Sequence, residues 1–115
     1  MNKVEQSVAW ELEALKREGK IKSWDRKVKP LVLCESSLRT GRPITYTPDF
    51  VVDVLIGGYQ RRIFIEVKGP HLWEDSYIKF EWARRFEGLY HFVWYEPSRN
   101  SSPKTIAEAI EEVLK

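Results

Sequence analysis

The sequence predicts an α/β protein with a mixed four-stranded sheet flanked by helices, in the order αβββαβα. Three observations support this fold class. Apolar residues recur at helical spacing near both ends of the chain. Two β-rich runs are joined by Gly57-Gly58, a dipeptide typical of a tight hairpin turn. A further helical segment then separates this hairpin from an aromatic strand, which implies a helical crossover within one sheet.

The first helix is expected at residues 3–18, and Gly19 ends it. Its apolar stripe consists of Val4, Val8, Leu12 and Leu15. A polar connection over residues 20–30 leads to a first strand at 31–34. Residues 46–56 and 60–68 form the second and third strands, on either side of the glycine turn.

Side chains alternate along a strand, so the third strand has two different faces. Ile63, Ile65 and Val67 share one face. Phe64, Glu66 and Lys68 share the other. The chain then continues with a helix at 73–87, a strand at 90–95 and a last amphipathic helix, for which Ser102 is the expected cap and Pro103 the first helical residue.

Length and composition indicate one domain over residues 1–115. The net charge of +2 is too small to identify a nucleic-acid partner by itself. The single Cys34 excludes an intrachain disulfide, and a reducing cytoplasm is the expected location. We expect no signal peptide and no membrane span, because no apolar run approaches the ~20 residues that a span needs.

The residues that point to chemistry are Asp49, at the start of the second strand, and Glu66 with Lys68 on the third. Two carboxylates and a lysine on neighbouring strands suit a divalent metal and a polarised water. The alternatives are a strand-start aspartate that binds nearby amides, and an exposed salt bridge on a wet strand face. Phe64 argues against the wet face, because it is a bulky apolar residue beside Glu66. Asp53 is either an outer acid of the same site or a solvated strand residue.

These residues resemble a known pattern. Pro48-Asp49 followed by Glu66-Val67-Lys68 looks like the motif of the PD-(D/E)xK nuclease superfamily. Residues 2–5, 46–50 and 66–69 together resemble small phage-type endonucleases that are similar to Holliday junction resolvases. The resemblance covers nearly the whole chain. It implies a restriction-endonuclease-like core and a single nuclease domain over residues 1–115.

The resemblance implies a metal-dependent DNA endonuclease that hydrolyses phosphodiester bonds and selects branched DNA by its structure. The implied catalytic residues are Glu5, Asp49, Glu66 and Lys68. Metal ligands would be the first three of these and the backbone carbonyl of Val67. Oxygen ligands suit Mg²⁺, with Mn²⁺ as a substitute. No organic cofactor is expected, and the two histidines, His71 and His91, do not suggest a zinc site.

The helix glutamate has two candidates. Glu5 lies on the flank of the apolar stripe of the first helix, which turns it toward the sheet edge. A glutamate in a first helical turn also interacts favourably with the helix N-terminus without any catalytic role. Glu11 flanks the opposite side of the stripe and is the substitute candidate.

Basic residues in the loops and on the helix after the third strand are candidate phosphate contacts. They are Arg39, Arg42, Arg61, Arg62, Lys79, Arg84 and Arg85. The alternative is an ordinary solvated face, since Glu81 and Glu87 dilute the charge of that helix.

The expected partners are DNA and a second copy of the chain, because one site cuts one strand and a homodimer would cut two. A phage-encoded protein would act in the host cytoplasm. Other functions remain open: a catalytic subunit of a larger transposase- or restriction-type complex, a non-catalytic DNA-binding module, or a plain structural domain. The sequence also leaves open DNA versus RNA, the preferred structure or sequence, and the number of metals.

Overall fold

The computed structural model describes residues 2–26, 28–68 and 74–115. The helices are α1 (Lys3–Arg17), α2 (Glu74–Ala83), the short 3-10 helix η1 (Arg84–Phe86) and α3 (Ile106–Leu114). The strands are β1 (Ser23–Asp25), β2 (Leu31–Cys34), β3 (Ile44–Tyr46), β4 (Phe50–Ile56), β5 (Tyr59–Val67) and β6 (His91–Tyr95).

The expected mixed four-stranded sheet is present, with strand order β1-β4-β5-β6. β4 pairs with both β1 and β5 in antiparallel fashion, whereas β5 and β6 are parallel. Gly57 and Gly58 have φ values of 57° and 83° and connect β4 to β5. Positive φ at both central residues is what a type I′ hairpin turn requires. The two-residue glycine signal therefore fixes the hairpin on which Asp49 and Glu66 lie.

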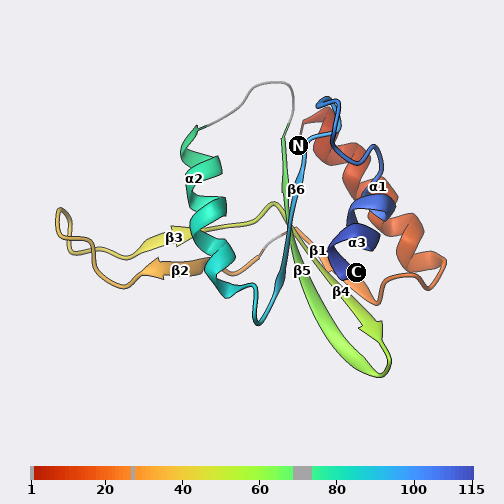
Figure 1. Ribbon diagram of the computed structural model, residues 1–115, viewed down its shortest axis with the longest axis horizontal. Helices are drawn as coiled ribbons and strands as arrows, with labels where there is room; N and C mark the ends of the chain where they lie inside the picture. The colour runs from red at the N-terminus through yellow and green to blue at the C-terminus, as the bar shows by residue number, and fades with distance from the viewer. Residues whose placement is uncertain (1, 27, 69–73) are drawn as a thin grey trace.

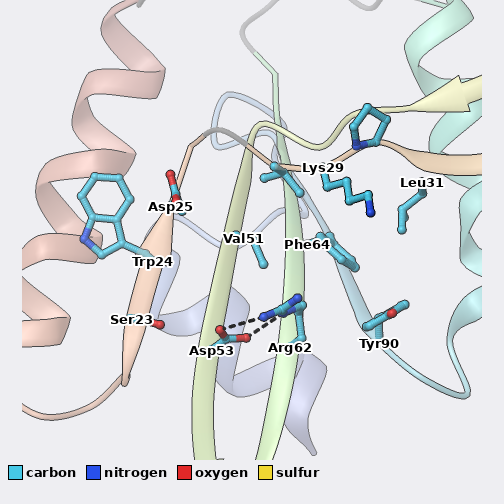
Figure 2. Close-up of a pocket in the computed structure, with 12 residues that line it drawn as sticks. Ser23, Trp24, Asp25, Lys29, Leu31, Val51, Asp53, Arg62, Phe64 and Tyr90 are labelled. Atoms are coloured by element: carbon cyan, nitrogen blue, oxygen red, sulfur yellow. Dashed lines mark hydrogen bonds and ion pairs between the residues drawn. The ribbon is translucent and has the colours of Figure 1, made fainter.

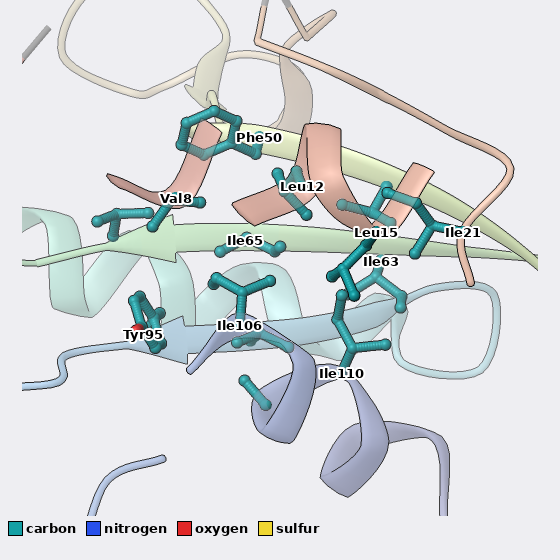
Figure 3. Close-up of a cluster of buried hydrophobic side chains, with 14 of the residues drawn as sticks. Val8, Leu12, Leu15, Ile21, Phe50, Ile63, Ile65, Tyr95, Ile106 and Ile110 are labelled. Atoms are coloured by element: carbon teal, nitrogen blue, oxygen red, sulfur yellow. The ribbon is translucent and has the colours of Figure 1, made fainter. Parts of the chain in front are cut away.

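Helices cover both faces of this sheet (Figure 1). α1 and α3 lie together on one face, and their apolar side chains pack against β4, β5 and β6 (Figure 3). This larger core includes Leu12, Phe50, Ile63, Ile65 and Ile106, each of them fully buried. The alternation expected for the third strand is confirmed, because Ile63, Ile65 and Val67 belong to this core.

A smaller aromatic core covers the opposite face, under α2 and the β2–β3 ribbon. Phe64, Phe80 and Phe92 lie at its centre, with ring centroids 5.6 Å apart for Phe64–Phe92 and 6.1 Å apart for Phe80–Phe92. Phe64 is 4% exposed, so the end of this face of β5 that carries Phe64 and Glu66 is not wet. Glu66 shares this face and is enclosed with it.

The expected first strand, residues 31–34, does not belong to the main sheet. It pairs with β3 as a separate two-stranded ribbon, which projects from the α2 side of the molecule (Figure 1). The edge of β4 is instead occupied by β1, in a segment expected to be a polar connection. Trp24 holds β1 there by packing against Phe50, with ring centroids 6.0 Å apart.

Two further boundaries differ from expectation. The strand expected at 46–56 is divided into β3 and β4, because Pro48 cannot donate to a ladder and the chain changes partner strands there. The last helix begins at Ile106 with Thr105 as its cap, since the Thr105 side chain accepts a hydrogen bond from the amide of Glu108. Ser102 was the wrong cap: its hydroxyl accepts from Arg99 Nε in the preceding turn.

Within the described parts of the chain, no helix combines the length and the apolarity needed to cross a bilayer.

Candidate active site

Asp49 lies at the point where the chain enters β4. Its amide donates to the carbonyl of Ile65 at 3.0 Å, and its Oδ2 accepts from the amide of Val67 at 2.8 Å. The buried Pro48 fixes the preceding backbone. The alternative of a strand-start aspartate that binds nearby amides is therefore correct in part, since Asp49 does bind the Val67 amide. That bond occupies one carboxylate oxygen and holds the side chain against the end of β5.

Glu66 is the most buried charged group near Asp49, with 4% of its surface exposed. Tyr46 donates its hydroxyl to Glu66 Oε1 at 2.6 Å, and Lys68 Nζ lies 2.9 Å from Oε2. The Lys68 side chain is only 12% exposed, and its Nζ lies 5.8 Å from the ring centroid of Trp94. An exposed surface salt bridge is excluded by this burial.

The pKa values of Asp49 and Tyr46 are shifted because both groups lie in this enclosed site. Burial raises the pKa of Asp49 to about 6, against the lowering effect of the Val67 amide. The charge of Glu66 raises it further, the charge of Lys68 opposes that, and a hydrogen bond with Glu66 favours the protonated form. Burial is also the main cause of the raised pKa of Tyr46, with Glu66 second. A proton held by Asp49 would be released when a cation binds to its carboxylate.

The donor atoms at this site fit a hard divalent cation, because they are carboxylate oxygens of Asp49 and Glu66. Among residues 2–26, 28–68 and 74–115, no three His, Cys, Asp or Glu side chains come close enough to form a metal-binding group. The structure thus brings together two of the three expected carboxylates.

Glu5 lies in the first turn of α1 and makes other contacts. Asn2 caps this helix, accepting from the Glu5 amide at 2.8 Å. The Glu5 carboxylate accepts from Asn2 Nδ2 at 3.2 Å and lies 3.6 Å from a guanidinium nitrogen of Arg26. Arg26 in turn lies 6.0 Å above the ring of Phe50, the residue after Asp49. Glu5 is therefore connected to the start of β4 through Arg26 and Phe50.

Glu11, the substitute candidate, has a structural role at another place. Its Oε2 accepts from the amide of Ile106 at 2.8 Å and from the amide of Ala107 at 3.4 Å. These are free amides of the first turn of α3. Glu11 therefore caps α3 from a different helix and joins the two helices that cover this face of the sheet.

The predicted phosphate contacts are spread over three regions. Arg39 and Arg42 lie exposed at the tip of the β2–β3 ribbon, and Arg61 and Arg62 lie beyond Ile63 toward the β4–β5 turn. With a rise of about 3.3 Å per residue, Arg62 is roughly 13 Å along β5 from Glu66. These four arginines therefore do not surround the carboxylates.

The arginines after α2 are largely engaged within the protein. Arg84 forms ion pairs with Glu81 at 3.1 Å and with Glu87 at 2.8 Å. Arg85 donates to the carbonyl of Leu33 and thereby ties η1 to the β2–β3 ribbon. Lys79 is exposed on α2.

A cavity of about 450 Å³ opens on the face of the sheet that carries Phe64 and Glu66, closer to β1 (Figure 2). Asp53 and Arg62 lie on its floor and form a two-bond pair, Oδ1–Nε at 2.9 Å and Oδ2–Nη2 at 3.2 Å. Asp53 is thus neither an outer acid of the site nor merely solvated: it pairs with the cross-strand Arg62. Lys29 and Tyr90 also line this cavity.

Tyr46 and Trp94 are the site residues that the sequence interpretation missed. Tyr46 was part of the motif but had no assigned role, and Trp94 was only one of several aromatics in a strand. The alternation of β6 could have placed Trp94 opposite Glu66 once the parallel register was known. His91 lies in β6 and is half-buried, whereas His71 and Gly69 lie outside the described residues.

No family model, curated protein or solved structure matches this chain.

Proposed function

We propose that this protein is a metal-dependent DNA endonuclease with a PD-(D/E)xK-type site. The observation that carries the proposal is the enclosed cluster of Asp49, Glu66 and Lys68 at neighbouring strand ends. Placing the half-buried Asp49 beside the buried Glu66 is unfavourable unless cations compensate both charges, and the ion pair with Lys68 accounts for only one of them. The arrangement is therefore better explained by a bound cation than by stability.

Asp49, Glu66 and the Val67 carbonyl would hold Mg²⁺ or Mn²⁺. A bound Mg²⁺ supplies a water of lowered pKa and offsets charge on the scissile phosphate. Lys68 would orient the attacking water with its ammonium group and stabilise negative charge in the transition state. Attack of the water oxygen on phosphorus breaks the P–O3′ bond, leaving a 5′-phosphate and a 3′-hydroxyl.

Tyr46 and Trp94 would be positioning residues, which orient Glu66 and Lys68. The Tyr46 hydroxyl fixes one oxygen of Glu66, so the other carboxylate lone pairs keep a defined direction. Trp94 lies beside Lys68 and restricts its ammonium group to the neighbourhood of Glu66. The raised pKa of Asp49 means that metal binding should weaken as the pH falls below about 6, because the proton then competes with the cation.

We further propose that the substrate is branched DNA and that the active species is a homodimer. One site of this kind cuts one strand, so paired cuts across a branch need two copies.

The direct test is a cleavage panel of linear duplex, single strand, fork and four-way junction, each as DNA and as RNA. We expect cleavage with Mg²⁺ or Mn²⁺ but not with Ca²⁺, and faster cleavage of the branched DNAs. Titration calorimetry with Mg²⁺ serves as an independent measurement of the site. Absence of cleavage across the whole panel, together with no heat of Mg²⁺ binding, would refute the proposal.

The role of Glu5 is tested by comparing Glu5→Gln with Glu11→Gln. We expect Glu5→Gln to lower cleavage by about 10–100-fold, as loss of a group that supports a metal site from outside does, because Glu5 reaches the start of β4 through Arg26. Glu11→Gln should cleave normally but melt at a lower temperature, because the cap that it provides to α3 is worth about 0.5–2 kcal/mol. Unchanged cleavage by Glu5→Gln would leave Glu5 only as a helix-terminus residue paired with Arg26.

A further inference from the structure

The outward side of α2 carries large apolar and aromatic side chains. Tyr77, Ile78 and Trp82 are 45%, 52% and 37% exposed. The sheet-facing side of the helix buries only Phe80 and Ala83 among the described side chains. A helix that merely covers a sheet is usually polar on its outer side. We call Tyr77, Ile78 and Trp82 the α2 strip.

The α2 strip begins beside the candidate active site. The ring of Tyr77 packs edge-on against Trp94, with centroids 5.4 Å apart and an interplanar angle of 86°. The Trp94 ring lies 5.8 Å from Lys68 Nζ, and Trp94 is opposite Glu66 in the register of β5 and β6. Two contacts thus link the ammonium group of the site to a half-exposed tyrosine. Trp82 follows about 7.5 Å further along the helix axis.

Positive charge accompanies the α2 strip. The Arg85 guanidinium carbon lies 6.0 Å from the ring of Trp82, and Lys79 is exposed on the same helix. Glu81 and Glu87 are both paired with Arg84, which offsets one of their two negative charges. Lys79 has no ion-pair partner among the residues that the structure describes. The region therefore combines aromatic faces with two cations, Lys79 and Arg85, that form no ion pair with the residues the structure describes.

Aromatic side chains interleaved with cations are the usual means of binding unpaired nucleic acid without reading its sequence. Bases in a duplex are stacked on each other and offer no free face, whereas bases of a single strand do. Phosphates complement Lys79 and Arg85, which an apolar peptide would not do. We propose that the α2 strip binds an unpaired stretch of the substrate. Tyr77 stacks on a base close to the scissile phosphate, and Trp82 stacks on one further away.

This inference rests on the proposed nuclease function, because it names the part of the substrate that the site selects. It explains a preference for branched DNA without a separate recognition domain: unpaired or unstacked nucleotides occur at a branch point and not in a continuous duplex.

The test measures binding without cleavage, in EDTA, by anisotropy of a fluorescein-labelled oligothymidine and of a blunt duplex. Tyr77→Leu and Trp82→Leu keep apolar bulk but remove the aromatic face. We expect each to weaken oligothymidine binding about tenfold and duplex binding much less. Tyr77→Phe should bind as wild type does. Trp10→Leu is the matched control, because Trp10 is 76% exposed on α1, over the other face of the sheet.

Equal affinity of Tyr77→Leu, Trp82→Leu and Trp10→Leu for oligothymidine would overturn the inference. So would a change from dimer to monomer in Trp82→Leu with unchanged binding, since the α2 strip would then be an interface between copies. If wild type cleaves the panel but the two variants bind normally, the α2 strip is refuted and the nuclease proposal stands. If wild type binds through the α2 strip but cleaves nothing, the nuclease proposal is refuted and the role of the α2 strip in binding stands.

Discussion

Asp49→Asn is expected to abolish cleavage and, at the same time, to raise the melting temperature of the protein at about pH 8. The loss of cleavage should be at least about 10²-fold, because a metal ligand is removed while binding of DNA survives. The gain in stability follows from the pKa of Asp49, which the fold raises from 3.8 to about 6.

The sign of the stability effect depends on which state binds the proton. Between about pH 4 and pH 6 the folded state holds a proton on Asp49 that the unfolded chain has released, so the folded state loses stability as the pH rises through this window. Asparagine is uncharged and can still accept from the Val67 amide. The difference in melting temperature between Asp49→Asn and wild type should therefore be large at about pH 8 and small at about pH 4.

Thermal melts across pH, with and without Mg²⁺, measure this directly. Mg²⁺ should raise the melting temperature of wild type and leave that of Asp49→Asn unchanged. Asp53→Asn is the matched control, since Asp53 lies on the same strand and face but pairs with Arg62. It should retain cleavage. Wild-type cleavage by Asp49→Asn, or a lower melting temperature at every pH, would contradict the role given to Asp49.

Lys68→Ala is expected to have the second large effect, a loss of both cleavage and stability. Cleavage should fall by about 10²–10³-fold, the usual result of removing one group that stabilises transition-state charge. Glu66, which is 4% exposed, would keep its bond to Tyr46 but lose the ammonium group that lies 2.9 Å away. Breaking a buried pair by removing one partner destabilises a protein by about 3–5 kcal/mol.

A double-mutant comparison separates the two effects. Glu66→Gln/Lys68→Ala should recover much of the stability, because no unpaired charge remains, but none of the cleavage. Lys20→Ala provides the control for an exposed ion pair, since Lys20 and Glu18 are 67% and 55% exposed. Its free energy of unfolding should fall by less than about 1 kcal/mol. Denaturant unfolding supplies the free energies. If Lys68→Ala is as stable as Lys20→Ala, the pair is not enclosed as described.

Local patterns in the sequence were sufficient for much of this architecture. The glycine pair placed the hairpin, alternation divided β5 into an apolar face and the face of Phe64 and Glu66, and helical periodicity located α1 and α3. Each of these depends on interactions between residues near one another in the chain. Phe64 also indicated correctly that the Glu66 face is enclosed.

Long-range competition decided what the local patterns could not. Residues 31–34 have the composition of a strand wherever they pair, and only the occupation of the β4 edge by β1 sends them to β3. Glu11 was a reasonable second ligand on its helix face until α3 placed its first amides against it. Arg84, similarly, was a candidate phosphate contact until its two glutamates were located.

The sequence by itself determined the hairpin, the two faces of β5 and the presence of two acids and a lysine on neighbouring strands. Only the tertiary structure decided that Tyr46 reaches Glu66 from a different strand, and that α2 presents Tyr77 beside Lys68 through Trp94. The physical reason is that periodicity fixes the direction of a side chain relative to its own element. Its partners and its pKa depend on which other elements pack there.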